Sequence, residues 1–290
     1  MPTVNDNYPK QGNSEISDAH LKELALQNYK QEEVKRSNFP TEIIELPSKG
    51  LLYSENNPLS SGKIEMKYMT AREEDILTSQ NLIKQGIVLD KLFQSMIVTP
   101  INYNDLVVGD KNAIMVSARI LGYGKDYGVE ITCPMCERIS EHSIDLTKLP
   151  TKEVTVDGLA KMIQPNQFEL ELPSSKRKVI FQLLTHGMDA AIDKQLAAEQ
   201  KIAKKDSVNT ELTTRLKQLI VSVDGNTDSA FIKNFVDNEL FAMDSRVLRA
   251  QIKAVAPDVP LVFSFECSHC GHEEAETEFP ISAQFFWPGA

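Results

Sequence analysis

The sequence predicts an α+β fold: a mixed globular body of short β-hairpins and helices, with a four-cysteine, zinc-ribbon-like site that is split by a largely helical insertion. Three observations predict this class. Short stretches of alternating apolar residues end at Pro, Gly, Ser or Asn and indicate hairpins. Longer stretches repeat apolar residues at helical spacing, and two Cys-x-x-Cys pairs each lie between β-like residues.

Composition narrows the classes of function. The 290 residues include 41 acidic and 31 basic side chains, which gives a formal charge of −10. Phosphate groups repel such a chain, so coating nucleic acid or lying on an anionic membrane is disfavoured. No apolar run reaches the roughly 20 residues that span a bilayer, and residues 1–14 do not resemble a secretory signal. We therefore expect a folded protein without a membrane segment that works where it is made.

The first of four predicted segments, residues 1–40, is a flexible tail that contains one amphipathic helix. Ser17 is a candidate N-cap because its hydroxyl can accept a backbone hydrogen bond. The apolar residues of this helix share one narrow face: Leu21, Leu24, Ala25 and Tyr29. That face either docks on another surface or belongs to a frayed, solvated helix.

Residues 41–149 form the second segment, an α+β body that holds the first cysteine pair. Two β-like stretches come first. A helix of about four turns follows, with a capping box at Thr70 and Glu73 and a stop at Gly86. The apolar face of a second helix is formed by Leu89, Leu92, Phe93, Met96 and Ile97. A third helix is expected to begin at a cap formed by Asp110.

The third segment, residues 150–259, is the predicted insertion. It opens with a hairpin that turns at Pro173, Ser174 and Ser175. Two helices that could pair antiparallel follow, with apolar faces formed by Met188, Ile192 and Leu196 and by Val208, Leu212, Leu216, Leu219, Ile220 and Val223. Two more faces are formed by Phe231, Ile232, Phe235, Val236 and Leu240 and by Val247, Leu248, Ile252 and Val255. The fourth segment, residues 260–290, returns to strand around the second cysteine pair.

The cysteines carry the strongest chemical signal. Cys133 and Cys136 lie in CPMC, and Cys267 and Cys270 lie in CSHCG. Two intervening residues let a tight turn point both sulfurs at one cation, and two such turns complete the tetrahedral set that zinc prefers. The pairs are separated by 130 intervening residues, far beyond the usual ribbon interval of about 15 to 20 residues. Either a module is inserted between the two hairpins, which we favour, or the pairs bind separately.

The predicted cofactor is therefore one structural zinc ion. Closed four-cysteine coordination leaves no open position for a substrate, so the metal is expected to hold structure and not to catalyse. Unliganded or disulfide-forming cysteines are the alternatives. His269 and His272 could substitute as ligands, but four thiolates are sufficient and we interpret these histidines as part of the turn surface.

No catalytic motif is present. The sequence lacks a phosphate-binding loop, a G-x-S-x-G elbow and an H-E-x-x-H helix. Three histidines stand apart from any nucleophile and are interpreted as ordinary ones: His20, His142 and His186. A calcium-loop pattern from Asp224 fails because Ser229 replaces the required glycine, and Asp228 is better interpreted as a helix cap. We expect neither an enzyme nor a small-molecule substrate.

The C-terminal sequence QFFWPGA is a candidate contact with a partner. Phe285, Phe286 and Trp287 could anchor in a pocket of another subunit. The alternative is that they pack against this protein's own ribbon.

Three stretches carry a resemblance to a known family: ELPSKGLLYSENNPLSSGKIEMKYMTAREEDILTS, DLVVGDKNAIMVSARILGYG and ITCPMC. They resemble the baseplate hub assembly proteins of T-even-type bacteriophages, most densely from Leu46 to Cys136. The resemblance implies a non-enzymatic virion or morphogenesis protein that contacts other baseplate and tail subunits. It also implies a location in the virion or, during assembly, in the host cytoplasm.

Two other functions compete with this one. A nucleic-acid-binding zinc ribbon requires basic residues around the cysteine turns, yet CSHCGHEEAETEF is strongly acidic. An uncharacterised hydrolase requires a pocket in which titratable groups converge, and the sequence supplies no such set.

Overall fold

The computed structural model describes residues 40–202, 210–281 and 285–287. The chain divides into two compact units, Met1–Pro40 and Thr41–Ala290. The helix predicted within residues 1–40 lies outside the described residues, as does Val208. The division of residues 41–290 into three segments stays a prediction.

The predicted pair of strands near the start of the larger unit is present. β1 (Thr41–Glu45) pairs antiparallel with β2 (Lys63–Lys67), and the 3-10 turn η1 (Pro58–Ser61) lies in their connection. Alternate side chains of β2 face opposite sides, so Ile64 and Met66 are buried while Lys63 and Glu65 are exposed. The pattern of alternating apolar residues therefore sets which face of this hairpin enters the core.

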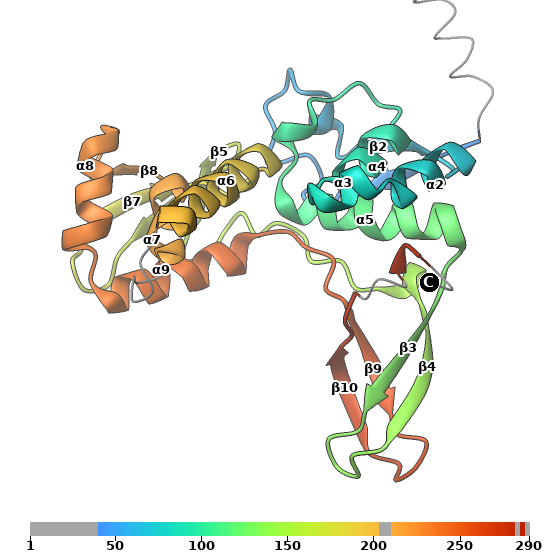
Figure 1. Ribbon diagram of the computed structural model, residues 1–290. Coiled ribbons are helices and arrows are strands. Elements are labelled where there is room, and N and C mark those ends of the chain that lie inside the picture. The colour runs from blue at the N-terminus through green and yellow to red at the C-terminus, as the bar shows by residue number, and fades with distance from the viewer. Residues whose placement is uncertain (1–39, 203–209, 282–284, 288–290) are drawn as a thin grey trace, which may run out of the picture. The chain divides into compact units, whose positions relative to one another are not determined.

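Four helices, α2, α3, α4 and α5, follow this hairpin along the chain (Figure 1), and α5 packs against β1. Their bounds are Ala71–Thr78, Gln80–Lys84, Val88–Met96 and Val108–Tyr123, and the 3-10 turn η2 (Tyr103–Asp105) precedes α5. The single four-turn helix that was predicted after Thr70 is thus two helices. Thr78 Oγ1 donates to the Glu74 carbonyl at 2.9 Å and Ser79 is extended (ψ 104°), because hydroxyl side chains compete with helical hydrogen bonding.

The predicted capping box is confirmed. The Thr70 backbone N–H donates to Glu73 Oε2 at 3.0 Å, and the Thr70 hydroxyl donates to the same oxygen at 2.6 Å. Glu73 is fully buried, and its other oxygen accepts from Lys67 Nζ and from Ser95 Oγ, each at 2.7 Å. Burial raises the pKa of Glu73, but these donors outweigh burial and lower the pKa to about 2.

The predicted cap at Asp110 is wrong. α5 begins two residues earlier, and Asp110 is a fully buried residue inside its first turn. One carboxylate oxygen accepts from the Ser48 backbone N–H at 2.9 Å, and the other accepts from the Tyr53 hydroxyl at 2.6 Å. Asp110 therefore fixes the loop after β1 to α5, a long-range role that local sequence does not reveal.

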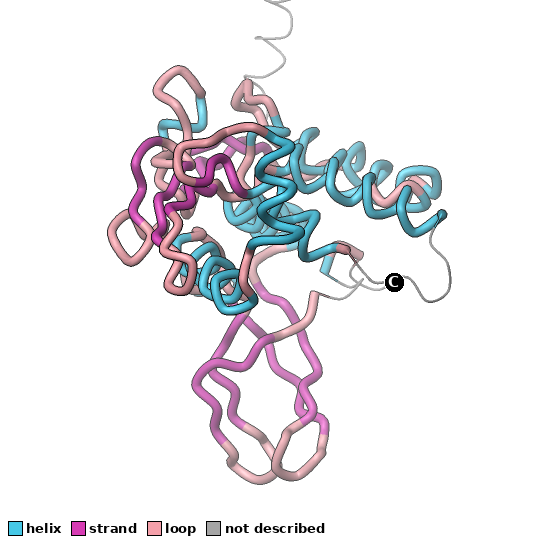
Figure 2. Tube along the Cα trace, turned by 90° about the vertical axis from the view of Figure 1, so that its left-hand side faces the viewer, coloured by secondary structure: helices cyan, strands magenta, loops and turns pink. Residues whose placement is uncertain are grey.

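Two hairpins from distant parts of the chain lie side by side (Figures 1 and 2). β3 (Asp126–Thr132) pairs with β4 (Ile139–Asp145), and the 3-10 turn η3 (Leu146–Lys148) follows. β9 (Val262–Glu266) pairs with β10 (Glu273–Glu278). We call residues 126–145 and 262–278 together the paired hairpins. Their turns hold the two cysteine pairs.

The chain between the two hairpins contains the predicted helices, but its sheet is larger than the single hairpin that was predicted. It contains a four-stranded antiparallel sheet in the order β5-β6-β7-β8, and these strands span Lys161–Gln164, Gln167–Glu171, Lys178–Phe181 and Ile220–Val223. The helices are α6 (His186–Ile202), α7 (Glu211–Leu219), α8 (Ser229–Asn234), the π-helical turn η4 (Phe235–Glu239) and α9 (Ala242–Val255). The predicted turn at residues 173–175 joins β6 to β7.

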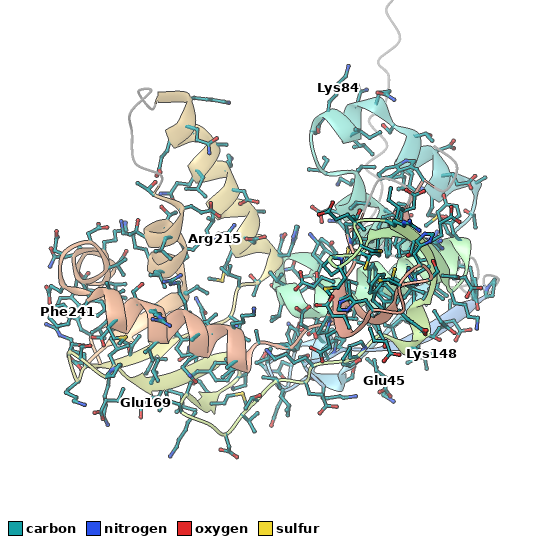
Figure 3. The ribbon with its side chains drawn as sticks, turned by 90° about the horizontal axis from the view of Figure 1, so that it is seen from below. Glu45, Lys84, Lys148, Glu169, Arg215 and Phe241 are labelled. Atoms are coloured by element: carbon teal, nitrogen blue, oxygen red, sulfur yellow. The ribbon has the colours of Figure 1, made fainter. Side chains whose placement is uncertain are left out.

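One strand of this sheet was predicted as part of a helix. The predicted helix that was expected to extend to Val223 ends at Leu219, and Ile220–Val223 joins the sheet beside β7. A short buried apolar run has the same composition in a helix and in a strand, so its spacing alone does not decide. The predicted pairing of the two helices is observed: Arg215 Nη1 on α7 lies 2.7 Å from Asp189 Oδ1 on α6 (Figure 3).

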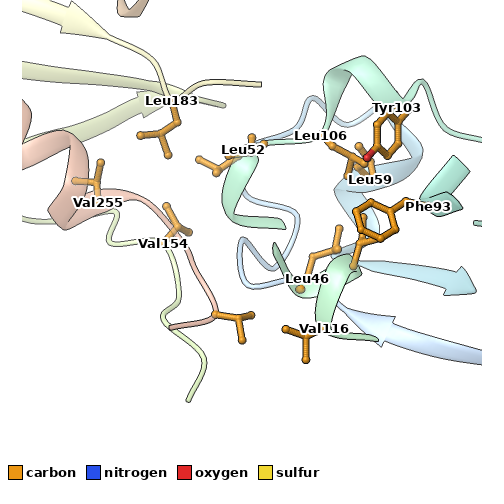
Figure 4. Close-up of a cluster of buried hydrophobic side chains, with 14 of the residues drawn as sticks. Leu46, Leu52, Leu59, Phe93, Tyr103, Leu106, Val116, Val154, Leu183 and Val255 are labelled. Carbon is orange, nitrogen blue, oxygen red and sulfur yellow. The ribbon is translucent and has the colours of Figure 1, made fainter. Parts of the chain in front are cut away.

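One continuous core joins these elements. We call residues 146–261, the chain between the two hairpins, the inserted part. Leu46 and Phe93 from the first part of the unit belong to the same buried cluster as Leu183 and Val255 from the inserted part (Figure 4). The chain enters and leaves the inserted part side by side, because the backbone groups of Lys152 and Asp258 exchange two hydrogen bonds of 2.9 and 2.8 Å.

The C-terminal aromatic residues pack against their own chain. Phe285 and Phe286 are 0% and 1% exposed, and the Trp287 indole N–H donates to the Leu77 carbonyl at 3.0 Å. The Phe285 ring lies 5.0 Å from the ring of Tyr127 at the base of β3. Of the two predicted roles, intramolecular packing is therefore the one observed, and these rings are not free to anchor in another subunit.

Candidate metal centre

The structure brings all four predicted cysteines together. Their Sγ atoms lie within 4.8 Å of one another, although the two pairs are far apart in the sequence. The nearest partners cross between the hairpins: Cys133 Sγ lies 3.7 Å from Cys270 Sγ, and Cys136 Sγ lies 3.7 Å from Cys267 Sγ. The hypothesis of separate binding by each pair therefore does not fit the arrangement.

The two cysteine turns have the same local geometry. Cys133 N–H donates to the Arg138 carbonyl at 2.9 Å, and Cys267 N–H donates to the His272 carbonyl at 2.8 Å. In each turn the residue after the second cysteine donates back to the carbonyl of the first, at 2.9 Å in both cases. That residue is in the left-handed region, with φ of 57° at Glu137 and 70° at Gly271. Gly271 suits this conformation, whereas Glu137 is strained.

The sulfur positions fit a tetrahedral metal site. Four sulfurs at the usual zinc–sulfur distance of about 2.3 Å form a tetrahedron with edges of about 3.8 Å. The crossing separations of 3.7 Å agree with these edges. A disulfide would require about 2.05 Å, and all four cysteines are free. Cys133 and Cys267 are buried, Cys136 is half-buried and Cys270 is exposed, so one side of the cluster faces solvent.

The electrostatics of the cluster call for a cation. Burial raises the pKa of Cys267, but the backbone N–H groups of His269 and Cys270 outweigh burial and lower the pKa to about 5. At Cys270 the His272 backbone N–H lowers the pKa, but burial and the neighbouring sulfurs prevail and raise it to about 12. Sulfurs this close cannot all ionise unless a positive charge lies among them. A divalent metal would supply that charge.

Neither of the two histidines that could have substituted as ligands joins the cluster. His269 Nε2 lies 3.2 Å from the Ile139 carbonyl of the other hairpin, and His272 is likewise absent from the metal-ligating group found among the described residues. Two residues that support the cluster from within were not predicted. Ser140 is 2% exposed with its Oγ 3.7 Å from Cys267 Sγ, and the His142 ring lies 5.0 Å from the ring of Phe265. The alternation along β4 places these two side chains on one face and was the available signal.

The other predicted candidates have structural partners. Asp228 caps α8 as predicted, since its carboxylate accepts from the Phe231 N–H at 2.8 Å. Asp224, the first residue of the rejected calcium pattern, accepts from the Lys178 backbone N–H at 2.9 Å. His186 lies between Asp90 and Lys111, and burial, together with Lys111, lowers its pKa. His20 lies outside the described residues.

A cavity of about 370 Å³ lies beside α5 and α7, and most of its lining is apolar. Its charged side chains already have partners: Arg215 pairs with Asp189 at 2.7 Å, and Asp258 Oδ1 accepts from Asn112 at 2.8 Å. The cavity therefore does not offer the converging, unpaired titratable groups that a hydrolase needs.

Comparison with known proteins identifies the family. A family model described as T4 bacteriophage base plate protein matches residues 42–287. The chain belongs to this family. The matched range includes both cysteine pairs and the inserted part, so it covers almost all of the described residues. The resemblance to baseplate proteins is thereby confirmed, whereas the restriction to hub proteins stays a prediction.

The other comparisons add no relative. No curated protein and no solved structure matches the chain. Among the described residues, no helix is both long enough and apolar enough to cross a bilayer.

Proposed function

We propose that this chain is a non-enzymatic structural or assembly protein of the phage baseplate hub, and that it acts through contacts with other baseplate and tail subunits. The family match over residues 42–287 carries the proposal. The chain would then be located in the virion tail, or in the host cytoplasm while the baseplate assembles. Its function would reside in its surfaces and not in a catalytic pocket.

We also propose that the four cysteines, Cys133, Cys136, Cys267 and Cys270, bind one structural zinc ion. The crossing sulfur separations of 3.7 Å and the matching backbone turns support this assignment. Bound zinc would neutralise the thiolates and hold β3–β4 to β9–β10. Four thiolates fill a tetrahedral site, which leaves no position for a substrate or an activated water molecule. Such a site stabilises a fold and does not catalyse.

The zinc assignment is tested by native mass spectrometry of the full chain purified without chelators. We expect one zinc ion per chain, and loss of that zinc in the Cys133→Ser and Cys267→Ser variants. The matched control is His269→Ala, which removes a nearby potential ligand and should retain zinc. Zinc loss in all three variants, or zinc-free wild-type protein, would overturn the ligand assignment.

The assembly role is tested by following a tagged full chain through infection. We expect it to co-purify with baseplates or with baseplate assembly intermediates. Presence in intermediates and absence from finished tails identifies an assembly factor, and presence in both identifies a virion component. Absence from both refutes the proposed function.

A further inference from the structure

The negative charge of the chain is concentrated on the paired hairpins. They contain one basic residue, Arg138, and ten acidic ones, which gives them a formal charge of −9 out of −10 for the whole chain. The rest of the chain carries 31 acidic and 30 basic residues and is nearly neutral. The acidic residues of the paired hairpins are Asp126, Glu130, Glu137, Glu141, Asp145, Glu266, Glu273, Glu274, Glu276 and Glu278.

These charges are poorly compensated within the chain. Glu130 lies directly opposite Glu141 across β3 and β4, and Glu266 lies opposite Glu273 across β9 and β10. Like charges at facing positions destabilise a sheet. Among the described residues, Asp145 is the one member of the ten that forms an ion pair, at 3.0 Å from Lys125. The paired hairpins thus carry a repulsion that the chain itself does not relieve.

The end of the paired hairpins also exposes apolar side chains. Met135, within the first cysteine turn, is 72% exposed, and Ile139, at the start of β4, is 57% exposed. The turns of both hairpins lie at the same end (Figures 1 and 2), and backbone hydrogen bonds fix each turn. Exposed apolar side chains on a fixed loop are suited to contact with a partner, and Met in particular adapts to irregular pockets.

We propose that the paired hairpins dock against a basic surface of another protein subunit, with Met135 and Ile139 entering an apolar recess in that surface. This inference rests on the proposed function, because it names the kind of partner that the baseplate protein contacts. Charge complementarity selects the occupant. A second copy would place one charge of −9 against another, and nucleic acid or an anionic membrane carries the same sign. A lysine- and arginine-rich protein surface instead relieves the repulsion at both facing glutamate pairs.

The first test is site-specific photocrosslinking in assembling baseplates. The photoreactive residue p-benzoylphenylalanine replaces Met135 in the full chain. As a matched control it replaces Leu159, which is 64% exposed and lies outside the paired hairpins. We expect position 135, and not position 159, to crosslink to a lysine- and arginine-rich surface of another protein. Crosslinks to a second copy, to nucleic acid or to an acidic surface, or no crosslink, would overturn the proposal.

The second test separates docking from folding. The double variant Glu141→Lys with Glu273→Lys converts both facing glutamate pairs to opposite charges, so it should not weaken the hairpins. It nevertheless reduces the charge of the paired hairpins from −9 to −5. We expect its incorporation into baseplates to fall about tenfold, with an unchanged or higher unfolding midpoint. The charge-matched control, Glu55→Lys with Asp75→Lys, changes two exposed residues elsewhere and should incorporate like wild type.

The outcomes distinguish this inference from the proposed function. If wild type is absent from baseplates and intermediates, the proposed function fails and the docking inference fails with it. If wild type incorporates and the Glu141→Lys, Glu273→Lys variant incorporates equally well, the docking inference alone fails.

Discussion

Loss of the proposed zinc ion should release one of the paired hairpins from the other. The perturbation is chelation of the wild-type chain, or Cys267→Ser, which removes one of the buried sulfurs. The shortest loop that the site closes between the hairpins runs from Cys136 to Cys267, a separation of 131 residues. Treating the metal as a crosslink that closes this loop gives a stabilisation of about 5 kcal/mol from chain entropy alone.

Part of this loop is already closed by other contacts. The Tyr127 ring lies 5.9 Å from Phe279 and 5.0 Å from Phe285, so the base of the paired hairpins is held without metal. The value of about 5 kcal/mol is therefore an upper bound for the chain-entropy part of the change in unfolding free energy. We expect the turn ends of the hairpins to open first, while the rest of the core stays folded.

Two assays follow the effect. Urea denaturation of the zinc-bound and chelated chains measures the change in unfolding free energy. Hydrogen–deuterium exchange then locates it, with faster exchange expected in residues 126–145 and 262–278 and unchanged protection in α5. His269→Ala is the control and should behave like wild type. Equal midpoints and equal exchange with and without metal would refute the argument that the site joins the hairpins.

Three further predictions concern other parts of the fold. Residues 137 and 271 both have left-handed backbone, which suits glycine and strains other residues. Glu137→Gly should therefore raise the unfolding free energy by about 1–2 kcal/mol, and Gly271→Ala should lower it by about the same amount. Urea denaturation measures both changes. Glu73 has a pKa of about 2 against an ordinary value of 4.5, so its stabilisation is present above pH 4.5 and is lost as pH falls toward 2. Glu73→Gln should flatten the fall in thermal midpoint over this range. Phe286→Ala should cost about 3–5 kcal/mol because the ring is buried. Trp287→Phe should cost less, because it keeps an aromatic ring in place and removes the indole hydrogen bond and part of the ring.

Contrary results would be equally informative. If Glu137→Gly and Gly271→Ala changed the unfolding free energy in the same direction, left-handed backbone strain would not explain the difference between glutamate and glycine at these positions. A Glu73→Gln variant that keeps the wild-type pH dependence would assign the acid transition to other carboxylates. A Phe286→Ala variant with wild-type stability would show that the C-terminal rings do not belong to the core.

The candidate site could be predicted from the sequence because its signal is local and chemical. The two-residue spacing within each cysteine pair, and the β-like residues on both sides, sufficed to place Cys133, Cys136, Cys267 and Cys270 at two hairpin turns. The capping box at Thr70 was predicted for the same reason, since both partners lie within one helical turn.

Features that depend on distant parts of the chain could not be read in this way. Asp is a residue type that often caps helices, but the Asp110 carboxylate binds Ser48 and Tyr53, which lie about 60 positions earlier. The run after Leu219 became a strand because β7 offers an unpaired edge to it. Of the four aligned strands between the cysteine pairs, β6 and β7 were predicted as a hairpin, whereas β5 and β8 were missed because their apolar residues stand side by side at 162–163 and 220–221 and do not alternate clearly.

The split arrangement of the cysteines sets an order of events during synthesis. Cys136, the later cysteine of the first pair, leaves the ribosome 131 positions before Cys267, which at about 5–20 residues per second is a delay of about 7–26 s. Until then no four-thiolate cluster exists, whatever the state of the rest of the chain. Capture of the proposed zinc ion would thus be reserved for chains whose synthesis has passed Cys270, and retained zinc would report that the inserted part has been made and brought back to the first hairpin.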